Sequence, residues 1–172
     1  MFIDMKQLFE VEGQVIPFTH DLDMSAIELW GTAPFDRPIR LSGRLYNRAG
    51  IVFMEYTAQM DYNLMCGRCL ERQRRAEVYR FKHVLVRQLN EEDNGDFIVV
   101  SGNQLDLDGL ATSDILLELP SVVYCREDCK GLCPVCGANL NEKDCGCNLK
   151  QPDPRLQILS EFFKESYSLR RC

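Results

Sequence analysis

Two neighbouring stretches of the chain alternate between apolar and polar residues. Residues 39–48 alternate apolar side chains with polar and basic ones, and residues 51–65 carry a mostly apolar side chain at every even position. A period of two is typical of a β-strand with one buried face. The Asn-Arg-Ala-Gly sequence at 47–50 favours a turn between the two stretches. We therefore predict a long β-hairpin.

Less regular patterns predict the remaining elements. The alternation resumes over residues 71–89, and a further short strand is expected at 97–101. Thr112 or Ser113 could cap a short helix that stops near the next proline. The Asp-Pro pair at 153–154 is typical of a helix start, and apolar residues at helical spacing follow it, so we predict a C-terminal amphipathic helix.

Together these elements predict an α+β fold. Its main part is an antiparallel β-sheet that could close into a barrel-like structure, with one or two helices and a cysteine-rich, metal-stapled C-terminal segment. We expect a strand-rich antiparallel domain over residues 1–120. Residues 121–172 would form a cysteine-rich zinc segment with the C-terminal helix packed on it.

The cysteines carry most of the chemical information in the sequence. There are nine of them in 172 residues, and their odd number and tight pairing favour metal or redox chemistry over a disulfide framework. Cys133-Pro-Val-Cys136, followed by Gly137, has the form of a zinc knuckle, and Cys145-Gly-Cys147 follows closely enough to complete a site. We predict that these four thiolates bind one metal ion.

A second site is predicted less directly. Cys66-Gly-Arg-Cys69 is another pair, and Cys125 and Cys129 have the i, i+4 spacing of one helical face. These four could form the second site. In the other partition, Cys66 and Cys69 join the knuckle, and Cys125 and Cys129 join the last pair. The sequence does not decide between the two partitions, and Cys172 is expected to be the spare thiol.

Zinc suits an all-cysteine tetrahedral site best, although iron or an iron–sulfur cluster could use the same ligands. We expect one or two structural zinc ions and no enzymatic activity, because four protein ligands leave no open coordination position. The sequence contains no phosphate-binding glycine loop, GxSxG or HExxH motif, and His20 and His83 fit packed or surface positions. The alternative is a thiol-based redox protein that uses its CxxC pairs.

Charge is segregated along the chain, although the net charge is only −6. Residues 1–36 and 90–172 are acidic, whereas residues 37–89 carry eleven bases and four acids. The basic segment could be solvated strand faces or a nucleic-acid footprint, and Tyr46 and Tyr79 could stack on unpaired bases. The residues predicted to contact RNA or a partner are Arg40, Arg44, Arg48, Arg68, Arg72, Arg74, Arg75, Arg80 and Lys82. The acidic flanks could instead bind a basic protein.

Three motifs resemble those of the YceD-type family, which is associated with accumulation of large-subunit ribosomal RNA (rRNA) in bacteria and plastids. They are the first cysteine pair with its following leucine, the string CREDCKGLCPVCGANLNEKDCGC at 125–147, and DPRL at 153–156. The resemblance implies a non-catalytic factor in large ribosomal subunit biogenesis. Its expected partner is rRNA, a large-subunit assembly intermediate or a basic ribosomal protein.

The expected location is the cytoplasm. Residues 1–13 have neither the basic and apolar regions of a secretion signal nor the composition of a transit peptide. The apolar runs are only a few residues long, far short of a bilayer-spanning helix. We therefore expect no membrane association, and no small-molecule substrate.

Overall fold

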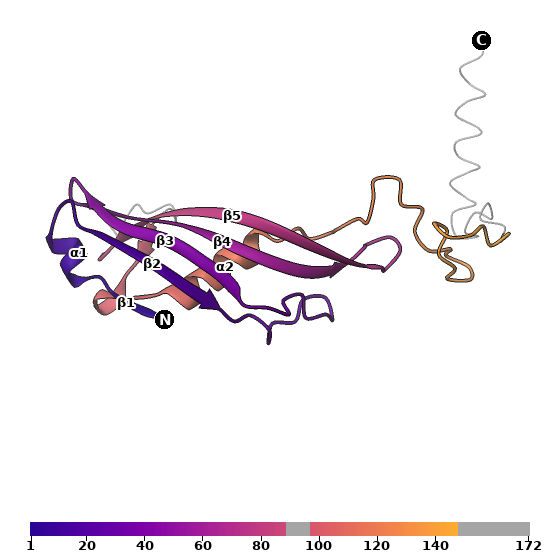
Figure 1. The fold of residues 1–172 in the computed structure, drawn as a ribbon, viewed down its shortest axis with the longest axis horizontal. Helices are drawn as coiled ribbons and strands as arrows, with labels where there is room; N and C mark the ends of the chain where they lie inside the picture. The colour runs from indigo at the N-terminus through magenta and orange to yellow at the C-terminus, as the bar shows by residue number, and fades with distance from the viewer. Residues whose placement is uncertain (89–96, 148–172) are drawn as a thin grey trace, which may run out of the picture. The chain divides into compact units, whose positions relative to one another are not determined.

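The computed structural model describes residues 1–88 and 97–147 (Figure 1). The chain divides into two compact units. The first consists of Met1–Gly67 and Glu71–Cys125, and the second of Arg68–Leu70 and the chain from Arg126 onward. The C-terminal helix predicted after residue 153, its packing and Cys172 lie outside the described residues.

The first unit is built on a five-stranded sheet with the order β2-β3-β4-β5-β6. Its strands are β2 Val15–Leu22, β3 Ile39–Arg48, β4 Ile51–Met65, β5 Arg72–Val86 and β6 Phe97–Val99. The predicted hairpin is confirmed, since β3 and β4 pair antiparallel over the predicted residues. All pairs are antiparallel except β5 with β6, which is parallel. The prediction that the sheet could close into a barrel is wrong, because β2 and β6 are unpaired edge strands within the described chain.

Several short elements complete this unit. They are β1 Phe2–Asp4, α1 Lys6–Glu10, the 3-10 turn Ser101–Asn103, β7 Gln104–Asp106 and α2 Leu107–Glu118. The predicted helix start at Thr112 or Ser113 is wrong, because α2 begins five residues before the first of them. The carboxylate of Asp106 accepts a hydrogen bond from the Gly109 N–H at 3.3 Å and caps the helix there. Ser113 lies inside α2 and donates to the Gly109 carbonyl instead.

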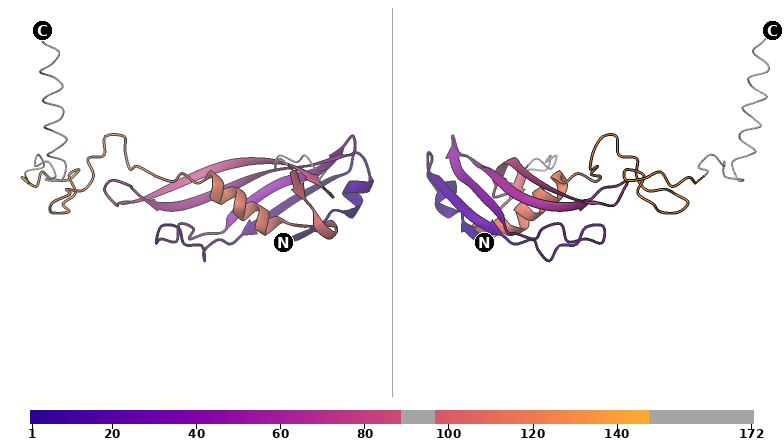
Figure 2. Two further views of the ribbon diagram at one scale, coloured as in Figure 1. Left: turned by 180° about the vertical axis from the view of Figure 1, so that it is seen from behind. Right: turned by 45° about the vertical axis from the view of Figure 1, so that its right-hand side comes forward.

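The core lies between one face of the sheet and α2. Every even position of β4 is buried, and α2 contributes Leu107, Ala111 and Ile115 at helical spacing. From behind, α2 lies across this face of the strands (Figure 2). Asp114 of α2 also accepts a hydrogen bond from the Tyr56 hydroxyl and contacts His83 Nε2 at 2.7 Å. These polar contacts fasten the helix to β4 and β5.

Gly43 allows an unusually close approach of β3 to β4. It pairs with Tyr56, and a Cβ at this position would lie 2.3 Å from the Glu55 carbonyl oxygen and 2.4 Å from the Tyr56 Cβ. Both atoms belong to the backbone or to its first side-chain carbon, so neither can move aside without shifting the strand. Only glycine therefore fits at this position, because any larger residue would clash with β4.

We expect Gly43→Ala to lower the free energy of unfolding by about 1–3 kcal/mol, the usual cost of overpacking. Urea unfolding measures it. The control is Ser42→Ala on the exposed side of the same strand, which should change stability by less than about 0.5 kcal/mol. Equal stability of the two variants would contradict the close approach.

Candidate metal centres and nucleic-acid interface

The knuckle around Cys133 is formed by a tight loop in the second unit. The Gly137 N–H donates to the Cys133 carbonyl, and the Cys133 N–H donates to the Ala138 carbonyl, each at 2.8 Å. Gly137 has a φ of 73°, in the left-handed region that glycine adopts without strain. The loop therefore turns back on itself and holds Cys133 and Cys136 side by side.

Four sulfur atoms gather at this loop. Those of Cys133, Cys136, Cys145 and Cys147 all lie within 4.8 Å of one another. Hydrogen bonds from the backbone N–H groups of Cys136 and Val135 lower the pKa of the Cys133 thiol to about 6. Hydrogen bonds with Cys136 and Cys145 raise the pKa of Cys147 to about 12. The closeness of the sulfur atoms thus favours ionisation of one thiol and opposes ionisation of the next. A bound cation would offset the repulsion between the thiolates.

The other cysteines form a group of the same kind. The sulfur atoms of Cys66, Cys69, Cys125 and Cys129 also lie within 4.8 Å of one another, and all but the half-buried Cys125 are buried. The described structure therefore has the first of the two partitions left open by the sequence. The Cys125 N–H donates to Cys66 Sγ at 3.4 Å.

Asn141 is a neighbour of the sulfurs that sequence reasoning missed. Its Nδ2 donates to Cys129 Sγ at 3.3 Å and to Asn139 Oδ1 at 2.9 Å. Hydrogen bonds to a thiolate sulfur stabilise its charge and orient it. In the sequence, only the position of Asn141 between Cys136 and Cys145 pointed to this role.

Each group supplies four sulfur donors, and no histidine or carboxylate belongs to either. Four thiolates in a small space fit a tetrahedral ion such as zinc, and they fit iron equally well by donor type. The two tetrads are therefore positioned to hold a metal ion.

A second candidate site is the solvent-facing side of β3, β4 and β5, which we call the outer face. Strand pairing aligns its residues in rows, for example Arg44 beside Glu55 beside Lys82. Its only acids are Glu55 and Asp61, both on β4. Its bases are Arg40, Arg44, Arg48, Arg72, Arg74, Arg80 and Lys82. Seven bases against two acids leave this face strongly positive, in contrast to the whole chain.

Part of this charge is paired on the surface. Glu55 contacts Arg44 at 3.2 Å and Lys82 at 3.4 Å, and Asp61 contacts Arg74 at 2.6 Å. Hydrogen bonds from Tyr46 and Arg44 hold the pKa of Glu55 below its ordinary value, so this residue stays anionic. Exposed pairs of this kind are weak and leave the bases available to a stronger partner.

Four bases of the outer face form no ion pair with another residue that the structure describes: Arg40, Arg48, Arg72 and Arg80. All four are exposed. They can therefore approach phosphate groups without first breaking an ion pair to another described residue.

Three residues of the predicted interface lie elsewhere. The Arg68 guanidinium donates to the carbonyls of Glu127 and Cys129, at 3.0 and 3.1 Å, within the second unit. Arg75 is on the core side of β5 and donates to the Tyr124 carbonyl at 3.1 Å. Tyr79, also on the core side, packs against the core, so its prediction as a stacking residue on this face is wrong.

Tyr46 does stand on the outer face, with a partner that sequence reasoning missed. Its ring stacks on that of Phe53, with 5.3 Å between centroids and 23° between planes. The two residues are directly opposed in the β3–β4 pairing. The predicted hairpin register could have found Phe53, because it places this residue across from Tyr46.

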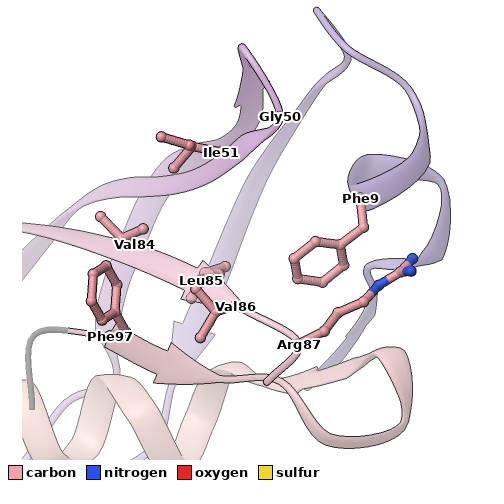
Figure 3. A pocket seen from close by; sticks show the side chains of 8 residues that line it. All are labelled: Phe9, Gly50, Ile51, Val84, Leu85, Val86, Arg87 and Phe97. Carbon is pink, nitrogen blue, oxygen red and sulfur yellow. The ribbon is translucent and has the colours of Figure 1, made fainter. Parts of the chain in front are cut away.

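An apolar pocket lies at one end of the sheet (Figure 3). Its volume is about 400 Å³, and Phe9, Val84 and Phe97 are among the apolar residues that line it. Among the described residues, Arg87 is the one charged residue of the lining, with its guanidinium 4.9 Å from the Phe9 ring and 3.8 Å from Glu10. The lining residues that the structure describes bring together no acid–base pair.

Comparison with known proteins bears on both sites. Residues 54–163 match the family described as "Large ribosomal RNA subunit accumulation protein YceD", nearly two thirds of the chain. The chain belongs to the YceD family. The YceD match covers nearly all of β4, the whole of β5 and α2, and both cysteine tetrads. β3, which carries three of the seven outer-face bases, precedes it.

Curated relatives of the chain include an uncharacterized protein of Mycobacterium bovis and two of Mycobacterium tuberculosis. Each is 34% identical over 112 residues, which is 61% of this chain and 53% of the relative. The chain thus spans about half the length of the curated relatives it matches. No solved structure is significantly similar to it. Among the described residues, none of the helices has the length and apolar character needed to span a membrane.

Proposed function

We propose that this protein is a non-catalytic factor in large ribosomal subunit biogenesis that binds rRNA, or an assembly intermediate containing it, through the outer face. The observation that carries the proposal is the excess of bases on that face, in a chain whose family is described by rRNA accumulation. Phosphate neutralisation by lysine and arginine supplies most of the sequence-independent affinity for nucleic acid. A sheet with one solvated basic face is suited to that task.

The cysteine tetrads would have a structural part in this function. Cys133, Cys136, Cys145 and Cys147 would hold one zinc ion, and Cys66, Cys69, Cys125 and Cys129 a second. Zinc bound by four thiolates has no position for a substrate, which supports the non-catalytic assignment. The binding free energy of such an ion stabilises the folded segment around it.

The experiments below also distinguish two alternative functions. A thiol-based redox protein would need exposed, metal-free CxxC pairs, and Cys136 is exposed. A binder of basic ribosomal proteins would use the acidic segments rather than the outer face. Both would leave RNA affinity independent of the outer-face bases.

Reversing two unpaired bases of the outer face tests the RNA contact. We expect Arg40→Glu with Arg80→Glu to weaken binding to an rRNA fragment by at least tenfold and to reduce the salt slope by about 1.4, because two phosphate contacts to a single strand are lost. Fluorescence anisotropy at several salt concentrations measures both quantities.

The matched control carries the same charge change elsewhere in the first unit. Lys6→Glu with Arg87→Glu alters α1 and the residue that follows β5, away from the rows of the outer face. This variant should keep most of the affinity. If both double variants lose the same affinity for RNA, the effect is one of net charge alone. If Arg40→Glu with Arg80→Glu leaves RNA binding unchanged, the proposed RNA contact is contradicted.

Metal content tests the tetrads. Natively purified protein should contain about two zinc ions by elemental analysis, and Cys133→Ser should retain about one, because three ligands hold zinc much less tightly than four. Cys172→Ser is the control and should retain both ions. Protein without metal and with rapidly alkylated Cys66 or Cys69 would contradict the structural assignment and favour the redox function.

A further inference from the structure

The outer face combines an aromatic platform with its cations. The stacked rings of Tyr46 and Phe53 are half-buried, so part of each ring surface is open to solvent. The Arg44 guanidinium carbon lies 5.2 Å from the Tyr46 ring centroid, and Lys82 Nζ lies 5.7 Å from that of Phe53. Glu55 Oε1 accepts a hydrogen bond from the Tyr46 hydroxyl at 2.8 Å and fixes the ring in place.

A hollow of about 570 Å³ lies next to this platform. Ser42, Arg44, Glu55, Thr57, Arg80 and Lys82 are among its lining residues, from two successive cross-strand rows. Gly43, which lies between the rows on β3, also lines it. Three cations face one carboxylate in the hollow. Since Glu55 is shared by Arg44 and Lys82, Arg80 is left without an ion-pair partner among the described residues.

The rows follow one another at the spacing of the strands. The aromatic row of Tyr46 and Phe53 lies two residues along β3 and β4 from the row of Arg44 and Glu55, which corresponds to about 7 Å. An extended nucleotide can bridge that step, with its base on the rings and its phosphate among the cations. Stacking of this kind requires a base that is not paired in a duplex.

We propose that the outer face binds single-stranded RNA in preference to duplex, with an unpaired base on Tyr46 and Phe53, the adjacent phosphate in the hollow between Arg44 and Lys82, and the next phosphate one row further along, at Arg80. The proposal rests on the proposed function and gives it a substrate class. Arg44, whose guanidinium lies over the Tyr46 ring, adds a planar cation beside the rings, since a guanidinium plane stacks on bases as it does on tyrosine. The Ser42 hydroxyl adds a donor for phosphate oxygens, whereas the Thr57 hydroxyl donates to the Ser42 carbonyl at 3.2 Å.

The experiment compares Phe53→Leu with the unaltered protein, using a twelve-nucleotide oligouridine strand and a twelve-base-pair RNA duplex at the same series of salt concentrations. We expect the unaltered protein to prefer the single strand. Phe53→Leu should weaken single-strand binding by about tenfold, as for the loss of one stacked base, and leave duplex binding and the salt slope unchanged. Phe53→Trp keeps a stacking surface and should retain the affinity.

Phe97→Leu is the matched control, because Phe97 is an exposed aromatic residue of β6 outside the outer face. It should bind like the unaltered protein. Equal affinity for strand and duplex, unaffected by Phe53→Leu but lowered by Arg40→Glu with Arg80→Glu, would overturn this proposal and leave the proposed function standing. Absence of binding to either RNA and to the rRNA fragment would overturn both.

Discussion

The side chains of β4 alternate between a buried and a solvent-facing set over its fifteen residues, and both the core and the outer face depend on that alternation. The even positions are buried in the core to which α2 also contributes, and among the odd positions Glu55 aligns with Arg44 of β3 and Lys82 of β5. A slip of one residue in the pairing would exchange the two sets and bury charge. Burial of the apolar side chains in the core thus determines which basic and aromatic side chains lie together on the solvent-facing side of the sheet.

Charge has to be considered by region in this protein. The chain is acidic overall, and four thiolates around one zinc ion would add a charge of about −2 at each tetrad. The outer face is nevertheless positive, because the acids on its strands are few and the remaining acids lie elsewhere in the chain. Nucleic acid would therefore be attracted to one face and repelled by the acidic regions. This favours an oriented contact over diffuse binding.

The long hairpin was predictable to the residue, because local alternation and burial agree along β3 and β4. The start of α2 was not predictable in this way. Asp106 and Asp108 alternate with leucines as in a strand, although Asp106 caps the helix. Tyr79 was predicted on the wrong face and Phe53 was missed for a different reason. Whether aromatic residues of neighbouring strands share a face depends on the pairing register between those strands, which the pattern of a single strand does not give. The partition of the cysteines depended on contacts between residues about sixty positions apart, which no local spacing determines.

Ultraviolet crosslinking in cells that make this protein, followed by mass spectrometry of the RNA-linked peptides, tests the central claim most directly. The crosslinked RNA should be large-subunit rRNA, and the linked peptides should contain Tyr46 or Phe53, because aromatic residues stacked on bases crosslink efficiently. Recovery of large-subunit rRNA on those peptides would locate the contact on the outer face. Recovery of no rRNA, or crosslinks confined to residues outside β3, β4 and β5, would contradict the account.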